Sequence, residues 1–94
     1  MKTVSDINAM PPNQLLSWFL IGSFVYYKLS DCRVMEDPTF DHLVKRLKEH
    51  WGEVDHYHKH LVTESHLDAT TGYDIDYPKI VQYSAYQYLK ENSL

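Results

Sequence analysis

The sequence contains little cysteine, little glycine and no excess of positive charge. A single cysteine, Cys32, excludes an internal disulfide framework and cysteine-rich zinc modules, and it favours a reducing, cytoplasmic compartment. Gly22, Gly52 and Gly72 lie too far apart in the chain to form a Gly-rich phosphate-binding loop. The net charge of -4 argues against a general nucleic-acid binder, because that role needs a cationic face.

Long hydrophobic runs are also missing. The strongest apolar stretch covers only residues 15–25, whereas a helix needs about 20 apolar residues to cross a bilayer. The beginning of the chain lacks the basic segment and the small-residue cleavage site of a signal peptide. We therefore expect no membrane contact, and we interpret the apolar stretch as a central helix that is buried on most sides.

The remaining composition is that of a folded domain, because 44% of the residues are apolar and 14% are aromatic. We expect a single all-α domain over residues 1–94, a small bundle of three to four helices. The expected helices cover residues 14–29 (with Asn13 as a cap), 37 to about 51, 64–69 and about 78–91. Residues 1–10 show no clear period and are expected to form at most a short element.

The second of these helices has the strongest sequence signals. Asp37 is expected to cap its N-terminus, and Pro38 fits its first position. Its apolar residues follow helical spacing and define one buried face, formed by Phe40, Leu43, Val44, Leu47 and Trp51.

Aromatic and acidic residues meet around the start of this helix. Asp37, Phe40 and Asp41 share one helical face, because they are spaced i, i+3 and i+4. Tyr26 and Tyr27 lie near the end of the preceding helix, and a short connection brings the two ends together. We expect a pocket mouth with aromatic faces, which attract flat cationic rings, and carboxylates, which accept hydrogen bonds from ribose hydroxyls or an amide. This chemistry suits a nicotinamide nucleoside better than a bare phosphate.

The same stretch resembles the small N-terminal helical subdomain (Ia) of bacterial NAD-dependent DNA ligases. That family carries Tyr-His, a short turn, and then Asp-x-x-Tyr-Asp-x-Leu, and its subdomain binds the nicotinamide mononucleotide half of NAD. Tyr26 matches the family tyrosine that packs on the nicotinamide ring, and Asp37 and Asp41 match the two acidic residues. Tyr27 replaces the family histidine, and Phe40 replaces the second tyrosine. The resemblance covers about residues 14–60 and implies that NAD or nicotinamide mononucleotide is the ligand.

The resemblance does not extend to ligase catalysis. The 94 residues leave no room for the nucleotidyltransferase domain, and the Lys-x-Asp-Gly motif of that domain is absent. We therefore expect a non-catalytic module without catalytic residues. Small stand-alone proteins of this kind resemble bacteriophage accessory proteins, which implies the host cytoplasm as the location.

Each pocket residue also has a structural interpretation. Asp37 is suited to capping, and Asp41 lies in the first turn, where a negative charge complements the helix dipole. Phe40 fits the core, and the two tyrosines fit the rim of an aromatic-rich core.

Histidines alternate after the second predicted helix, at His56, His58 and His60. On one strand face they would form a zinc site together with Asp55 or His66. The competing interpretation is a solvated histidine cluster, which gains positive charge below about pH 6.5. We predict no metal site and retain these histidines as the only weak candidates.

The last predicted helix carries Tyr83, Tyr86 and Tyr88, which cannot all face the core. Exposed tyrosines are common in protein interfaces, so Tyr83 and Tyr86 are candidate contacts for a host protein or for a second copy of the chain.

Two hypotheses follow for the function. The first is a small-molecule module that holds NAD or nicotinamide mononucleotide through Tyr26, Tyr27, Asp37, Phe40 and Asp41. The second is a protein-interaction module that targets a host enzyme and keeps the pocket only as a vestige. An enzyme acting on nicotinamide nucleotides is a third, less supported class, because no nucleophile or base is evident.

Overall fold

The computed structural model describes residues 2–29, 34–56, 58–63, 66–67 and 75–92. The described part is all-α, as predicted, and contains four α-helices and no strand. The helices are α1 (Val4–Asn8), α2 (Pro12–Phe24), α3 (Asp37–Glu49) and α5 (Lys79–Asn92). The Cα radius of gyration is 12.1 Å, close to the roughly 12 Å expected of a compact domain of this length.

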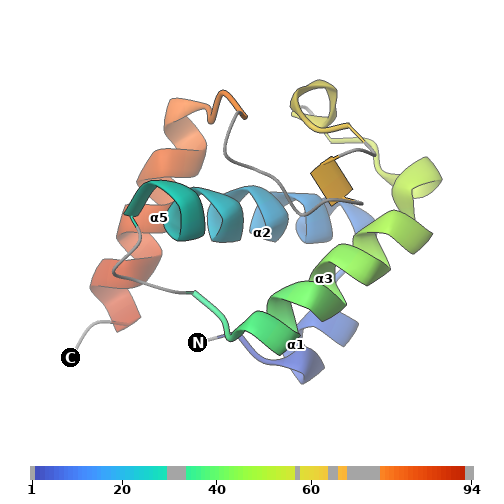
Figure 1. Cartoon of the computed structure of the whole chain (residues 1–94), viewed down its shortest axis with the longest axis horizontal. Helices are drawn as coiled ribbons and strands as arrows, with labels where there is room; N and C mark the ends of the chain where they lie inside the picture. The colour runs from blue at the N-terminus through green and yellow to red at the C-terminus, as the bar shows by residue number, and fades with distance from the viewer. Residues whose placement is uncertain (1, 30–33, 57, 64–65, 68–74, 93–94) are drawn as a thin grey trace.

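Helix α2 lies in the centre of the molecule, with α3 on one side and α5 on the other (Figure 1). Every residue from Phe19 to Val25 is buried, so α2 is covered on most of its circumference, as predicted. The predicted cap at Asn13 is wrong, because Pro11 precedes the helix and Pro12 occupies its first position. Asn13 instead pairs with the backbone of Asp55: it accepts from the amide at 2.8 Å and donates to the carbonyl at 3.1 Å.

The α-helical part of α2 ends at Phe24 rather than at residue 29. The chain continues through a π-helical turn, η1 (Val25–Leu29). A π turn is closed by i→i+5 hydrogen bonds and therefore holds one residue more than an α turn. The side chains after Val25 consequently point in directions that differ from those of an uninterrupted α-helix.

Helix α3 covers α2 with the predicted apolar face. Leu43, Val44 and Leu47 are buried, and Phe40 and Trp51 pack against the core from its edge. The helix ends at Glu49, and Trp51 belongs to the following turn, η2 (Trp51–Glu53). The Lys59 ammonium, at the start of η3 (Lys59–Leu61), donates to the Trp51 carbonyl at 3.0 Å and lies 4.9 Å from the centre of the Trp51 ring.

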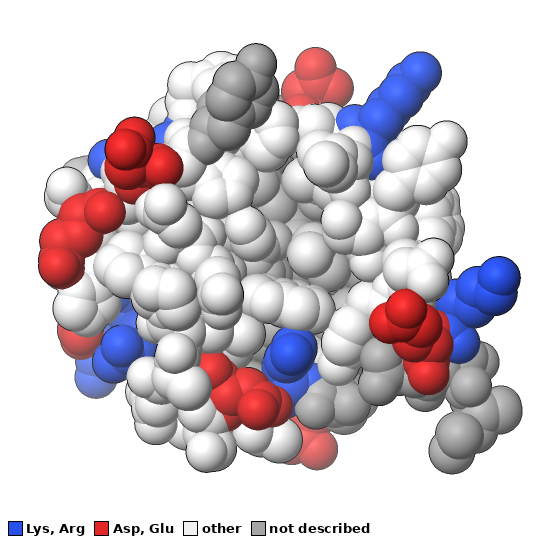
Figure 2. All heavy atoms as spheres, turned by 180° about the vertical axis from the view of Figure 1, so that it is seen from behind, with Lys and Arg blue, Asp and Glu red and all other residues white. Residues whose placement is uncertain are grey.

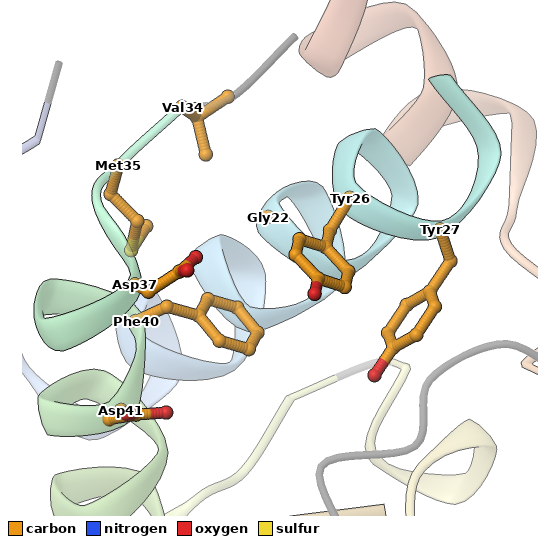
Figure 3. Close-up of a pocket in the computed structure, with 8 residues that line it drawn as sticks. All are labelled: Gly22, Tyr26, Tyr27, Val34, Met35, Asp37, Phe40 and Asp41. Carbon is orange, nitrogen blue, oxygen red and sulfur yellow. The ribbon is translucent and has the colours of Figure 1, made fainter. Parts of the chain in front are cut away.

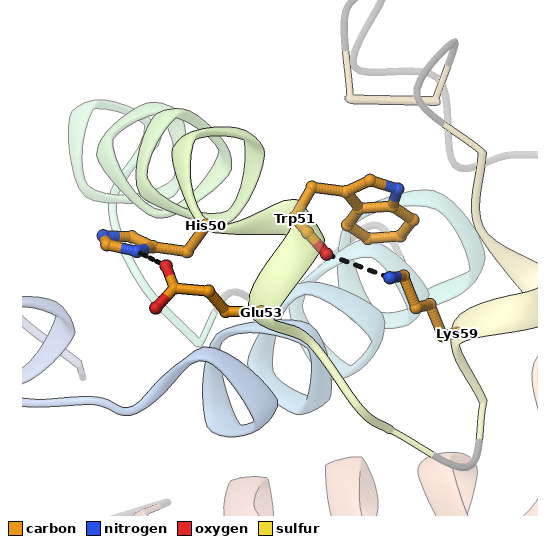
Figure 4. Close-up of polar contacts among 4 residues, drawn as sticks. All are labelled: His50, Trp51, Glu53 and Lys59. Carbon is orange, nitrogen blue, oxygen red and sulfur yellow. Dashed lines mark hydrogen bonds and ion pairs between the residues drawn. The ribbon is translucent and has the colours of Figure 1, made fainter.

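A second contact closes the same turn, between the His50 imidazole and the Glu53 carboxylate (Figure 4). The Lys59–Trp51 and His50–Glu53 contacts therefore hold the segment after α3 together, close to the end of that helix. Most of the predicted helix over residues 64–69 lies outside the described residues. The two described positions within it, His66 and Leu67, are helical.

The N-terminal segment forms a short helix that the sequence period does not reveal. Thr3 and Asp6 cap α1 reciprocally: the Asp6 carboxylate accepts from the Thr3 amide at 2.8 Å, and Thr3 Oγ1 accepts from the Asp6 amide at 3.3 Å. These hydrogen bonds lower the pKa of Asp6. Ile7 anchors the helix in the core.

Lys2 connects this segment to the rest of the fold. Its amide donates to the Val34 carbonyl at 2.9 Å, and its ammonium lies 4.6 Å from the ring centre of Trp18 on α2. Tyr88 of α5 lies edge-on to the Trp18 ring, at 5.1 Å between centroids. The N-terminal segment is therefore held against α2, beside the residues that precede α3.

Helix α3 makes a close contact with α2 at Gly22. A Cβ atom at this position would lie 2.9 Å from Cε1 and 3.2 Å from Cδ1 of Phe40. The Phe40 ring also stacks on Phe19, with centroids 5.9 Å apart and planes inclined by 17°. Glycine therefore lets an aromatic ring from α3 lie directly against the α2 backbone.

Gly22→Ala is expected to destabilise the fold by about 1 kcal/mol, measured by urea unfolding. Overpacking against Phe40 costs about 1–3 kcal/mol, and this outweighs the roughly 0.5–1 kcal/mol that alanine gains over glycine within a helix. In a Phe40→Leu background the same change should become stabilising, because the ring edge is gone.

Gly52→Ala is the matched control, since a Cβ atom there meets nothing within 4 Å. It should leave the stability nearly unchanged. A stabilising Gly22→Ala in the wild-type background would contradict the close contact with Phe40.

Candidate functional site

A cavity of about 300 Å³ opens where η1, α2 and the start of α3 meet (Figure 3). It is lined by residues from all three of these elements and from the chain just before α3, namely Gly22, Tyr26, Tyr27, Val34, Met35, Asp37, Phe40 and Asp41. All five residues that the sequence predicts for a ligand pocket are among them. The structure therefore brings these residues together, although ten positions separate Tyr27 from Asp37 in the chain.

The two tyrosines enter the pocket from the π-helical turn. Tyr26 and Tyr27 are neighbours in the chain, and in a regular α-helix adjacent side chains diverge by about 100°. In η1 both rings extend toward the same side, and they contact each other edge to face at 4.9 Å between centroids and 79° between planes (Figure 3). Tyr26 is 48% exposed and Tyr27 is half-buried. The π turn thus carries both aromatic side chains of the pocket rim.

Two carboxylates enter from the opposite side. Asp37 and Asp41 lie one turn apart on α3, are solvent-exposed, and extend from the helix toward the tyrosines (Figure 3). The prediction that Asp37 is the N-cap is wrong, since Glu36 occupies that position with extended backbone and Asp37 is the first helical residue. Asp37 still lies in the first turn, where its charge complements the helix dipole.

The Phe40 ring forms the inner surface between these two sides. It lies between the α2 backbone at Gly22 and the open cavity, and it is directed toward Tyr26 in Figure 3. One face of the Phe40 ring stacks on Phe19, and another part of the ring lines the pocket.

Val34 and Met35 complete the wall and were not predicted. Both are buried, and the hydrogen bond from the Lys2 amide to the Val34 carbonyl fixes their backbone. The sequence does hold a signal for these two wall residues: they are successive apolar residues directly before the Glu36–Pro38 helix start, in a connection that is otherwise polar or charged. Gly22, one turn before Tyr26, was the corresponding signal on α2.

The charged residues in the described lining of the pocket are all negative. None of its described lining residues is Lys, Arg or His, whereas two are Asp. Lys28, the cation nearest to the tyrosines in the chain, lines a separate hollow with Phe24, Leu29 and Tyr77. The face in Figure 2 shows acidic and basic side chains interspersed around an uncharged centre, with no basic patch on that face.

In the histidine-rich segment, His56 forms hydrogen bonds with the His58 backbone and with Ser17. The His58 amide donates to His56 Nδ1 at 3.0 Å, so neutral His56 carries its proton on Nε2. Nε2 lies 2.8 Å from Ser17 Oγ and must donate to it, while Ser17 Oγ donates to the Asn13 carbonyl at 3.3 Å. An activated serine nucleophile has to donate its proton to the imidazole. Ser17 does not, because in this arrangement it accepts from His56 and donates to the Asn13 carbonyl.

His60 is exposed, and His58 lies 5.6 Å from His56 between ring centres. Within the described ranges, no group of three or more His, Cys, Asp or Glu residues could hold a metal ion. Cys32 falls outside the described residues.

The tyrosines of α5 do not all face the core, as predicted from their spacing. Tyr83 and Tyr86 are exposed, by 74% and 51%, whereas Tyr88 packs against Trp18. Ile80 is 65% exposed and extends the same surface. Tyr86 also lies edge-on to Phe24 at 5.9 Å, so part of its ring supports the core.

Comparisons with protein families, with curated proteins and with solved structures gave no match for this chain. Among the helices that the structure describes, none is long and apolar enough to cross a membrane. The site is therefore interpreted from its own geometry and chemistry.

The partial burial of His56 predicts a pH-dependent stability. Burial lowers the pKa of His56 below its ordinary value of 6.5, and the neighbouring His58 lowers it further. The unfolded chain consequently binds more protons than the folded one below pH 6.5, so this contribution to stability is complete above pH 6.5 and is lost as the pH falls toward the folded pKa.

His56→Gln should flatten this part of the curve of unfolding free energy against pH, measured by urea unfolding between about pH 5 and 8. His60→Gln, which changes an exposed histidine of the same segment, is the control and should leave the slope as it is. An equal effect of both changes would contradict the assignment to His56.

Proposed function

We propose that this chain binds nicotinamide mononucleotide, free or as part of NAD, in the pocket between η1 and α3. The observation that carries the proposal is the composition of one cavity, whose lining includes Tyr26, Tyr27, Asp37, Phe40 and Asp41. These are the residues that match the nucleotide-binding motif of the ligase Ia subdomain.

The chemistry of the lining suits each part of such a ligand. The Tyr26 and Phe40 rings offer faces for the planar pyridinium, which is a cation. Asp37 and Asp41 offer acceptors for ribose hydroxyls and for the carboxamide. A volume of about 300 Å³ lies at the lower end of small-molecule sites, which fits one nucleoside rather than a whole dinucleotide.

The proposed role is binding without catalysis. The 94 residues contain no Lys-x-Asp-Gly motif, and the Ser17–His56 pair is oriented against nucleophile activation. A module of this kind would sequester the nucleotide or present it to another protein.

Asp41→Asn tests the proposal by isothermal titration with nicotinamide mononucleotide and NAD. Wild-type protein should bind with a dissociation constant below about 1 mM, and Asp41→Asn should weaken binding by about tenfold or more, as expected for losing hydrogen bonds to a charged acceptor.

Asp55→Asn is the control, because it removes the same charge from an exposed residue that does not line the cavity. Far-UV circular dichroism verifies that both variants are folded. Absence of binding by folded wild-type protein, or equal weakening by both variants, would refute the proposal.

A protein-interaction module is a second candidate function. The observation that favours it is the surface of α5, where Ile80, Tyr83 and Tyr86 are all at least half exposed. Large exposed side chains at spacing i, i+3 and i+6 form one continuous stripe along a helix. The expected partner is a host protein, and a second copy of this chain is the alternative.

The two functions predict opposite effects for two tyrosine variants. Tyr83→Ser should abolish capture of a protein partner, or self-association in sedimentation velocity, and should leave nucleotide binding unchanged. Tyr26→Ser should weaken nucleotide binding and leave association unchanged. Tyr83 is the better choice on α5, since the Tyr86 ring also packs on Phe24. If Tyr83→Ser changes no association, α5 has no role in an interface.

A further inference from the structure

We propose that the pocket recognises its ligand as a cation, so that it selects the positively charged nicotinamide riboside unit and gains nothing from the phosphate. This inference rests on the proposed function and specifies which part of the nucleotide supplies the affinity. It follows from the distribution of rings and charges around the cavity rather than from the motif that suggested the ligand.

The aromatic surfaces favour a cation. Tyr26 and Tyr27 meet edge to face, and Phe40 lies opposite them, with its far face packed on Phe19. The negative faces of aromatic rings attract a cation above them, and the attraction grows as water is excluded. A neutral ring of the same shape keeps the packing but loses this electrostatic attraction.

The carboxylates strengthen the same preference. Asp37 and Asp41 are one turn apart on α3 and both border the cavity, so their charges add at its mouth. No lining residue in the described part of the chain is Lys, Arg or His. The two charges of the described lining are therefore both negative, which favours a positively charged ring over a neutral one.

Among the described lining residues, phosphate has no corresponding partner. The start of a helix is the common phosphate site, but the first turn of α3 and the residue before it carry the carboxylates of Asp37 and Glu36, which repel an anion. Lys28 borders a different hollow, beside Tyr77 and Asp76. A phosphate attached to the ribose would extend toward solvent or toward negative charge.

Two matched ligand pairs test the inference by NMR titration of the full chain. The first pair is neutral nicotinamide and the nicotinamide cation methylated on its ring nitrogen. The cation should bind about tenfold more tightly or better, which corresponds to about 1.4 kcal/mol. The second pair is nicotinamide riboside and nicotinamide mononucleotide, and the riboside should bind at least as tightly.

Asp41→Asn sharpens the test, because it should weaken binding of the methylated cation by a larger factor than binding of neutral nicotinamide, whose only contact with the carboxylate is a hydrogen bond. Asp55→Asn should alter neither. Added salt should weaken riboside binding, since it screens the attraction between the ring and the carboxylates.

The outcomes separate the inference from the function on which it rests. Mononucleotide binding about tenfold tighter than riboside binding would show phosphate recognition and overturn the inference, while nucleotide binding itself would stand. Equal affinities for the neutral and the methylated ring would overturn it in the same way, by showing packing without charge selection. No binding of any of the four ligands by folded protein would overturn both.

Discussion

The unbroken burial of the chain from Phe19 in α2 to Val25 at the start of η1 is the constraint on which the rest of the structure depends. A helix that is apolar around most of its circumference has to be covered from more than one side, and α3 and α5 provide that cover. On the α3 side the Phe40 ring lies close against the α2 backbone at Gly22, where a larger residue would place its own side chain. The pocket adjoins this contact and extends from it to the two tyrosines of the π turn.

The sequence allowed much of this arrangement to be predicted because local spacing determines it. Asp37, Phe40 and Asp41 must share a face in any helix that contains them, and the buried face of α3 follows from the same period. The direction of Tyr26 and Tyr27 was less accessible, since an i→i+5 turn has no distinct residue pattern. Their place in the pocket was inferred from the short connection, which brought the helix ends together whatever the turn between them.

Contacts between distant parts of the chain could not be predicted in this way. Asparagine is a common capping residue, but the helix begins at the two prolines before Asn13. The side-chain amide of Asn13 pairs instead with the backbone of Asp55, 42 residues away. The Ser17–His56 pair spans 39 residues and has no local signal. Helix α1 is different, since Thr3 and Asp6 have the spacing of a reciprocal cap and only the shortness of the helix concealed it.

The hydrogen bond from Lys2 to Val34 gives the beginning of the chain a role in the pocket wall. Any change that displaces the Lys2 backbone would release that wall without altering a ligand-facing residue. The order of the chain also bears on synthesis: Lys2 is made before α2, and Val34 is made after it. The wall can therefore form only once the whole of the central helix has been synthesised.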